Sequence, residues 1–409
     1  METIRKFGLA YCDLPTMLWN VTVLLRVLIL NIDKRYTKQI PLFFYIITTV
    51  VAISYFYVYL VSMLWFVFVK CPETGDLIAA TVVFSLGVSS EIGTTKLFFM
   101  FMNKDLVKVI VEGYLHCDSL MIPNSRFANN VHKTQRIVKK RAIIFWIVII
   151  MNGIVYCVKP MFLPGRHLME DSLIVYGLEP IYESPNYEIA YWVTTLGVIF
   201  TCYLPANITA FLIIITGYTE AQMLALSEEV THLWEDAEEY YRKRHEDGEN
   251  GFKYKNAVMN EYVKKELTEI VKSHTMNINL LRKVENTFRG AIAVEFMLLT
   301  TGLIVELLGG LENTYIQVPF ALIQVAMDCL VGQRVMDASI VFENAIYDSK
   351  WEDFDNANKK TVLLMLQNSQ RTLTLSAGGI TMLSFTSLMA VLKSVYSAYT
   401  TLRSTMNKK

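Results

Sequence analysis

Seven long apolar segments dominate the pattern of hydrophobic and polar residues along the chain. Between Ile40 and Val69, for example, no charged residue occurs. A helix needs roughly 20 mostly apolar residues to cross a hydrocarbon core about 30 Å thick. We therefore predict an all-α, polytopic membrane protein with seven transmembrane helices, at residues 40–69, 77–102, 142–162, 189–217, 291–311, 315–341 and 373–402.

Charged residues inside these segments are few. The sixth segment carries Asp328, Arg334 and Asp337 after an apolar start. Because a charge at mid-bilayer costs about 2.5 to 3.5 kcal/mol, we expect the second half of this helix to leave the membrane. Glu91 and Lys96 of the second segment are interpreted as snorkelling residues or as a structural pair rather than as a transport pair.

The basic residues predict the topology. The N-terminal stretch, the loop at 103–141 and the connection at 218–290 are rich in Lys and Arg, whereas the loop at 163–188 is acidic. By the positive-inside rule the N-terminus is cytoplasmic, and seven crossings then place the C-terminus outside. This is the reverse of a G-protein-coupled receptor. Apolar residues at helical spacing on both sides of a break at Asp247–Gly251 predict a helical cytoplasmic layer rather than a solvated loop.

Composition excludes several functions. The chain has 409 residues, is 53% hydrophobic and has no formal net charge, so no basic domain suggests a nucleic-acid partner. The six cysteines lack CxxC spacing, and all six histidines fall outside the predicted spans. Because no phosphate-binding loop, HExxH or GxSxG motif is present, we predict neither an enzyme nor a cofactor or metal site.

Uncharged aromatic and aliphatic residues gather in the outer halves of the predicted spans. Small apolar ligands bind among such side chains with a few hydroxyl groups, although helix packing uses the same residues. Both interpretations stay open for any single position. The candidate ligand-binding residues are Phe84, Met151, Ile154, Tyr156, Trp192, Thr195, Ile199, Tyr203, Tyr315, Val318, Phe320 and Ile323.

The last third of the chain carries a set of short motifs in a fixed order. They are Cys329 and Gly332, Ala345-Ile346-Tyr347, Trp351, Leu366-Gln367 with Gln370, Gly378-Gly379, and Leu392-Lys393-Ser394-Val395-Tyr396-Ser397. As an ordered set they resemble the C-terminal signature of the insect odorant receptors. The ending Ser397-Ala398-Tyr399-Thr400-Thr401-Leu402-Arg403 resembles the ligand-tuned members rather than the family's co-receptor.

The resemblance implies an odorant-tuning subunit of an odorant-gated cation channel that opens without a G protein. It implies a hetero-oligomer, a tetramer with the odorant receptor co-receptor, in the plasma membrane of a sensory neuron dendrite, gated by a small neutral odorant. The last span would line the pore through Ser397, Thr401 and Ser404, where Thr401 aligns with the extracellular gate. Subunit contacts are expected at Tyr347, Trp351 and Tyr396.

The resulting domain organisation follows the resemblance and the predicted spans. It consists of a cytoplasmic N-terminal segment (1–39), transmembrane helices 1–4 with the odorant-binding region (40–217), a cytoplasmic anchor region (218–290), helices 5–6 (291–349), a second anchor segment (350–372), and the pore helix with an extracellular tail (373–409). A gustatory receptor channel subunit is the alternative with the same fold. A G-protein-coupled receptor or a secondary transporter fits the predicted topology less well.

Overall fold

The computed structural model describes residues 2–36, 39–244 and 252–406; the expected break at Asp247–Gly251 lies outside them. The α-helices are α1 (Glu2–Phe7), α2 (Leu14–Val27), α3 (Leu42–Tyr55), α4 (Met63–Trp65), α5 (Cys71–Thr74), α6 (Leu77–Met102), α7 (Lys104–Ser119), α8 (Arg126–Val158), α9 (Asn186–Arg244), α10 (Phe252–Leu308), α11 (Leu311–Thr314), α12 (Gln317–Tyr347), α13 (Asn356–Ser369) and α14 (Phe385–Met406). The π-helical turns are η1 (Phe56–Ser62) and η2 (Phe66–Lys70), the 3₁₀ turns are η3 (Lys159–Phe162) and η4 (Trp351–Asp353), and the strands are β1 (Ser376–Ala377) and β2 (Thr381–Met382).

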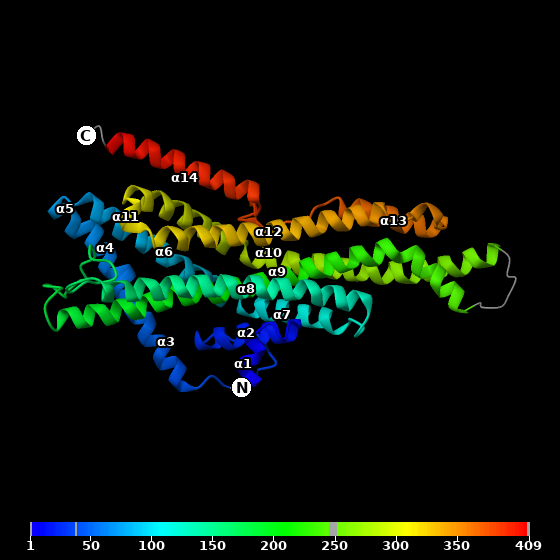
Figure 1. Cartoon of the computed structure of the whole chain (residues 1–409), viewed down its shortest axis with the longest axis horizontal. Helices are drawn as coiled ribbons and strands as arrows, with labels where there is room; N and C mark the ends of the chain where they lie inside the picture. The colour runs from blue at the N-terminus through cyan, green and yellow to red at the C-terminus, as the bar shows by residue number, and fades with distance from the viewer. Residues whose placement is uncertain (1, 37–38, 245–251, 407–409) are drawn as a thin grey trace.

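The helices form one elongated bundle (Figure 1). Six helical segments in the described residues are long and apolar enough to cross a membrane: Leu42–Thr74, Leu77–Met102, Arg126–Phe162, Asn186–Arg244, Tyr254–Leu308 and Gln317–Asp353. Helix α14 stands in place of the seventh predicted span. The prediction of an all-α polytopic membrane protein is therefore confirmed.

Several helices continue far beyond the predicted spans. Helix α8 begins at Arg126 rather than near Ala142, and α9 runs on to Arg244. In Figure 1 these extensions and α13 form the end of the bundle opposite α5 and α11. A second apolar core fills this end, with Leu233, Val263 and Phe342 among its buried residues. The predicted cytoplasmic connection is thus helical and packed in its described part.

Helix α9 is the axis of the bundle. Helices α2, α3, α6, α8, α10 and α12 all pack against it. Its residues are therefore buried on every side over much of its length, and Pro205 lies within it. Since α9 is surrounded by other helices, its sequence is apolar all round and shows no single core-facing stripe.

The last predicted span is shorter than expected. Helix α14 begins at Phe385 rather than near Leu373, because β1 and β2 form a small antiparallel hairpin before it. Gly378 and Gly379 make the turn with φ of 66° and 76°, which a residue with a side chain rarely adopts. The backbone N–H of Gly378 donates to the carbonyl of Arg289 at 2.9 Å, so the hairpin is attached to α10.

A buried ionic cluster joins four helices inside the bundle. Lys96 Nζ on α6 lies 2.6 Å from Glu295 Oε1 on α10 and 3.8 Å from Asp328 Oδ2 on α12. It also donates to Thr209 Oγ1 of α9 at 2.7 Å. Glu91 instead accepts a hydrogen bond from Thr94, so the suggested Glu91–Lys96 pair does not form. Asp328 does not leave the bundle, because it packs inward beside Lys96.

Candidate ligand-binding site

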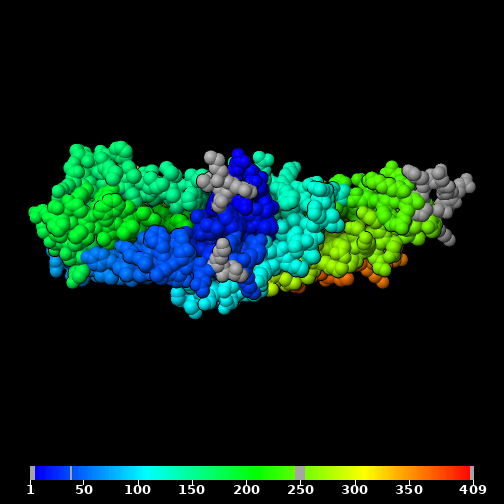
Figure 2. All heavy atoms as spheres, turned by 90° about the horizontal axis from the view of Figure 1, so that it is seen from below, coloured from blue at the N-terminus to red at the C-terminus, as the bar shows by residue number. Residues whose placement is uncertain are grey.

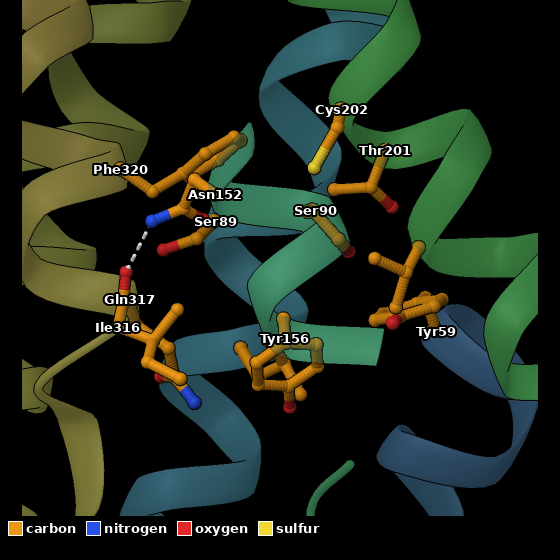
Figure 3. Close-up of a pocket in the computed structure, with 13 residues that line it drawn as sticks. Tyr59, Ser89, Ser90, Asn152, Tyr156, Thr201, Cys202, Ile316, Gln317 and Phe320 are labelled. Atoms are coloured by element: carbon orange, nitrogen blue, oxygen red, sulfur yellow. Dashed lines mark hydrogen bonds between the residues drawn. The ribbon is translucent and has the colours of Figure 1, made fainter. Parts of the chain in front are cut away.

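A small cavity of about 40 Å³ lies where α6, α8, α9, α12 and η1 meet (Figure 3). Its lining residues come from every one of these elements and from the turn before α12. They are Tyr59, Leu86, Ser89, Ser90, Asn152, Gly153, Tyr156, Val198, Thr201, Cys202, Ile316, Gln317 and Phe320. None of these lining residues is Asp, Glu, Lys, Arg or His.

Most polar side chains that line the cavity form hydrogen bonds within the protein. Asn152 Nδ2 donates to the carbonyl of Ile316 at 2.9 Å, the bond drawn in Figure 3. Ser89 Oγ donates to Glu306 Oε1, behind the lining, at 3.0 Å. Gln317 Oε1 accepts from Ser85 Oγ at 3.0 Å. These hydrogen bonds join α6 to α10 and α12, and α8 to the turn before α12, around the cavity.

Two buried donors among the lining residues lack a hydrogen-bond partner in the described part of the chain. They are the hydroxyl group of Tyr156 and the amide nitrogen Nε2 of Gln317. A buried polar group without a hydrogen bond costs about 1 to 3 kcal/mol. A molecule that supplied an acceptor oxygen to either donor would recover part of this free energy on binding.

The loop between α8 and α9 packs over the outer end of the bundle. Met169 and Leu173 are buried in the main apolar core, and the backbone N–H of Tyr176 donates to Ser62 Oγ at 3.2 Å. Asp171 Oδ2 lies 2.8 Å from His167 Nδ1, and this hydrogen bond raises the pKa of His167 above its usual range. The loop is thus an ordered cover that depends on several polar contacts.

The structure brings only part of the predicted ligand-binding set to this cavity. Tyr156 and Phe320 line it. Tyr203 instead donates its hydroxyl to the carbonyl of Leu24, so it joins α9 to α2. The residues exposed on the outer surface are Met151, Ile154, Trp192, Ile199 and Tyr315. The half-buried residues that do not line the cavity are Phe84, Thr195, Val318 and Ile323.

Sequence reasoning missed most of the polar lining. The candidate ligand-binding residues were mainly aromatic and aliphatic. The polar lining residues belong to neither class; they are Ser89, Asn152, Thr201 and Gln317. A usable signal was present, since Asn152 and Tyr156 are four residues apart in the sequence and share one face of a helix. Small or hydroxyl residues at such spacing mark where helices approach each other in a membrane.

The predicted pore and subunit-contact residues lie on exposed surfaces of the single chain. Ser397, Thr401 and Ser404 are exposed on α14. Thr401 Oγ1 donates to the carbonyl of Ser397 at 2.9 Å, and Ser404 Oγ to that of Thr401 at 2.8 Å. Their hydroxyls therefore bond to the backbone one turn back. The subunit-contact candidates Tyr347, Trp351 and Tyr396 are exposed as well.

The bundle defines a polytopic helical membrane protein with a small, uncharged cavity among its helices. The family model described as "7tm Odorant receptor" matches residues 76–396. The chain therefore belongs to the odorant receptor family, a family of receptors rather than enzymes. The family match therefore favours an odorant receptor over the alternatives of a gustatory receptor, a G-protein-coupled receptor and a transporter.

Individual relatives agree with the family. Odorant receptor 22a of Drosophila melanogaster is 26% identical over 146 residues, 34% of this chain and 37% of that protein. Odorant receptor 22c of the same organism is 28% identical over 147 residues, 34% of this chain and 35% of that protein. The matched region thus spans little more than a third of these relatives.

A solved structure shows the same fold. The insect olfactory receptor OR5 from Machilis hrabei, in a structure described as a complex with eugenol, superimposes with a TM-score of 0.75. The alignment covers 96% of this chain and 98% of that chain at 10% sequence identity. The likeness therefore extends over the whole bundle, including α14 and the helices predicted to be cytoplasmic.

Proposed function

We propose that the chain is the odorant-tuning subunit of a heteromeric, odorant-gated, non-selective cation channel. The observation that carries the proposal is the uncharged cavity with unpaired donors, in a chain of the odorant receptor family. Its partner is the odorant receptor co-receptor, in a tetramer in the plasma membrane of a sensory neuron dendrite. The complex of a structural relative with eugenol supports small-molecule binding by this fold.

The ligand is a small neutral volatile with a hydrogen-bond acceptor oxygen. The lining offers no charged partner, and burying an unpaired ion is far more costly than burying a neutral polar group. The unpaired hydroxyl of Tyr156 and amide of Gln317 favour a carbonyl or ether oxygen over a pure hydrocarbon. Carboxylates and amines are therefore poor agonists.

Binding also requires the cavity to enlarge. Sites that bury a drug-sized ligand are typically about 300 to 1,000 Å³, whereas this cavity measures about 40 Å³. Side chains at the meeting point of α6, α8 and α12 must therefore move when a ligand enters. Such movement gives the ligand a means of favouring one channel conformation over another.

The test is a panel of neutral oxygenated volatiles, with the matching hydrocarbons, acids and amines, on cells that express the chain with the co-receptor. Tyr156→Phe and Gln317→Leu should each lower the potency of oxygenated agonists about 5- to 100-fold and leave hydrocarbons less affected. Tyr45→Phe on the exposed face of α3 is the matched control. A response dominated by acids or amines that survives both substitutions would contradict the proposal.

Helix α14 supplies this chain's share of the pore. The helix packs on α10 and α12 and lies along one side of the chain in Figure 1, and its residues Ser397, Thr401 and Ser404 are exposed. Hydroxyls bonded to their own backbone remain able to face water, so their hydrogen bonds do not oppose this role. Gates that close by dewetting need apolar constrictions, so Thr401 makes a leakier gate than valine would.

Cysteine substitution tests the pore face. A water-soluble thiol reagent applied during odorant stimulation should block Thr401→Cys and Ser404→Cys channels and spare Leu402→Cys. The absence of state-dependent block at all three positions would remove α14 from the pore.

A further inference from the structure

A second, larger hollow lies on another side of the bundle, between the N-terminal helices and α8 with α9. It measures about 310 Å³ and is almost wholly apolar, with Val21, Leu24, Trp146 and Ile214 among its lining residues. In Figure 2 the N-terminal helices, in dark blue, lie across the middle of the molecule on the side of this hollow. Ile147 lines it and is 47% exposed, so the hollow is a groove open on the side of α8.

One end of this groove carries a buried positive charge. Lys139 is only 3% exposed, and its ammonium group donates to the carbonyls of Lys6, at 2.8 Å, and of Tyr11. No carboxylate in the described residues lies within ion-pair distance of it. The nearby Asp13 accepts from the backbone N–H of Thr16 instead. Since an ammonium group has three donors, one remains for a ligand.

A second buried polar group lies at the same end. Asn20 is 7% exposed, and its Nδ2 donates to the carbonyl of Lys6 at 2.8 Å. Its Oδ1 has no hydrogen-bond partner in the described part of the chain. The groove therefore combines an apolar channel with a charged donor and a free acceptor at one end, which is the pattern that an amphiphile with an anionic, hydroxylated headgroup would satisfy.

The surroundings are positive and adjoin the start of a predicted membrane span. Arg5, Lys6, Arg136 and Lys140 surround Lys139 in sequence or on α1, and no described acidic residue forms an ion pair with them. Lys139 lies three residues before Ala142, where the apolar part of α8 begins, and α2, with 14 residues, is too short to cross a bilayer. Clusters of basic residues at this boundary attract anionic lipids.

We propose that this groove binds an anionic phospholipid of the leaflet on the N-terminal side, predicted to be the cytoplasmic one. One acyl chain occupies the apolar channel beside Trp146, and the phosphate accepts a hydrogen bond from Lys139. A headgroup hydroxyl donates to Asn20 Oδ1. The lipid fastens α1 and α2 to α8 and α9, and the proposal does not rest on the odorant-binding function.

Brominated lipids provide the test, because bromine on an acyl chain quenches tryptophan fluorescence at short range. The full-length chain with its co-receptor is placed in phosphatidylcholine nanodiscs that contain brominated phosphatidylglycerol or brominated phosphatidylcholine. The Trp146 signal is the difference between the wild type and Trp146→Phe. Both phosphates can accept from Lys139, but only phosphatidylglycerol has a headgroup hydroxyl for Asn20 Oδ1 and no choline cation that Lys139 would repel. Half-maximal quenching should therefore need about tenfold less phosphatidylglycerol than phosphatidylcholine.

Three variants distinguish a specific lipid site from ordinary surrounding lipid. Lys139→Gln keeps a donor for the two carbonyls and should remove the preference for phosphatidylglycerol, whereas exposed Lys140→Gln should keep it. Ala210→Phe, which fills the groove, should reduce quenching by both lipids while Lys139 is intact. Equal quenching by the two lipids in the wild type, or equal effects of Lys139→Gln and Lys140→Gln, would mean ordinary surrounding lipid and overturn the proposal.

Discussion

Removing the charge of Lys96 should destabilise the bundle more than removing any exposed lysine. Lys96 is 2% exposed and Glu295 is fully buried, with Asp328 completing the cluster. In Lys96→Met the two carboxylates remain buried beside each other without a cation. Breaking a buried ion pair on one side typically costs about 3 to 5 kcal/mol, because the desolvation cost of the remaining charge is no longer offset.

The measurement is the melting temperature of the detergent-solubilised protein, read as the fraction that still elutes as a folded species after heating. Lys34→Met is the matched control, since its ion pair with Glu112 at 2.9 Å is exposed on both sides. The control should melt near the wild type, because solvent screens such pairs. Lys96→Met should melt well below both.

A rescue separates charge imbalance from lost packing. Adding Glu295→Gln and Asp328→Asn to Lys96→Met removes both unpaired charges and keeps the side-chain volumes, so a large part of the lost stability should return. If Lys96→Met alone melts like Lys34→Met, the cluster contributes no more than a surface pair. If the triple variant melts as low as Lys96→Met, the loss comes from packing, and the electrostatic reasoning is wrong.

Three further predictions follow from single contacts. The raised pKa of His167 means that its pairing with Asp171 stabilises the outer loop fully below the usual pKa of 6.5 and is lost as the pH rises through the higher folded value. The protection factors of the loop amides, which are corrected for the intrinsic pH dependence of exchange, should therefore fall as the pH rises above 6.5 in the wild type, but not in Asp171→Asn. Trp351→Ala should lower the yield of tetramers on size exclusion and leave the odorant ranking unchanged. Gly332→Ala should reduce odorant-evoked current without loss of assembly, because a methyl group there would overlap the backbone before α14.

The spans could be predicted because lipid imposes a strong, local requirement. The second predicted span, 77–102, coincides with α6, where the side chain of Asp76 accepts from the backbone N–H of Ala79 and marks the helix start. The start of the last span was predicted wrongly, because the hydropathy pattern does not reveal a turn of the backbone. Residues 373–384 are apolar enough to continue a helix, and hydropathy does not register that Gly378 and Gly379 turn the chain.

The candidate site was harder to predict, because in a membrane protein apolar residues face both lipid and core. Trp192 and Tyr315 are aromatic at the outer ends of helices, and the structure leaves both exposed, as is usual for aromatic residues at a membrane surface. Near the cavity α9 has an exposed side with Trp192 and Ile199 and a buried side with Thr201, but packing against other helices produces the same burial pattern as lining a cavity. Only the tertiary arrangement of five elements reveals that Thr201 and Gln317 line the same cavity.

Helix α12 connects these regions physically. It carries Gln317 and Phe320 at the cavity, Asp328 in the ionic cluster and Gly332 against the backbone that leads into α14. From Gln317 to Gly332 the helix spans about 22 Å, and a continuous helix of that length moves largely as a unit. A ligand that enlarges the cavity therefore acts on the same element that fixes the start of α14. Substitution of Gly332, which lies outside the cavity, should therefore separate ligand binding from the effect of the ligand on α14, the proposed pore helix.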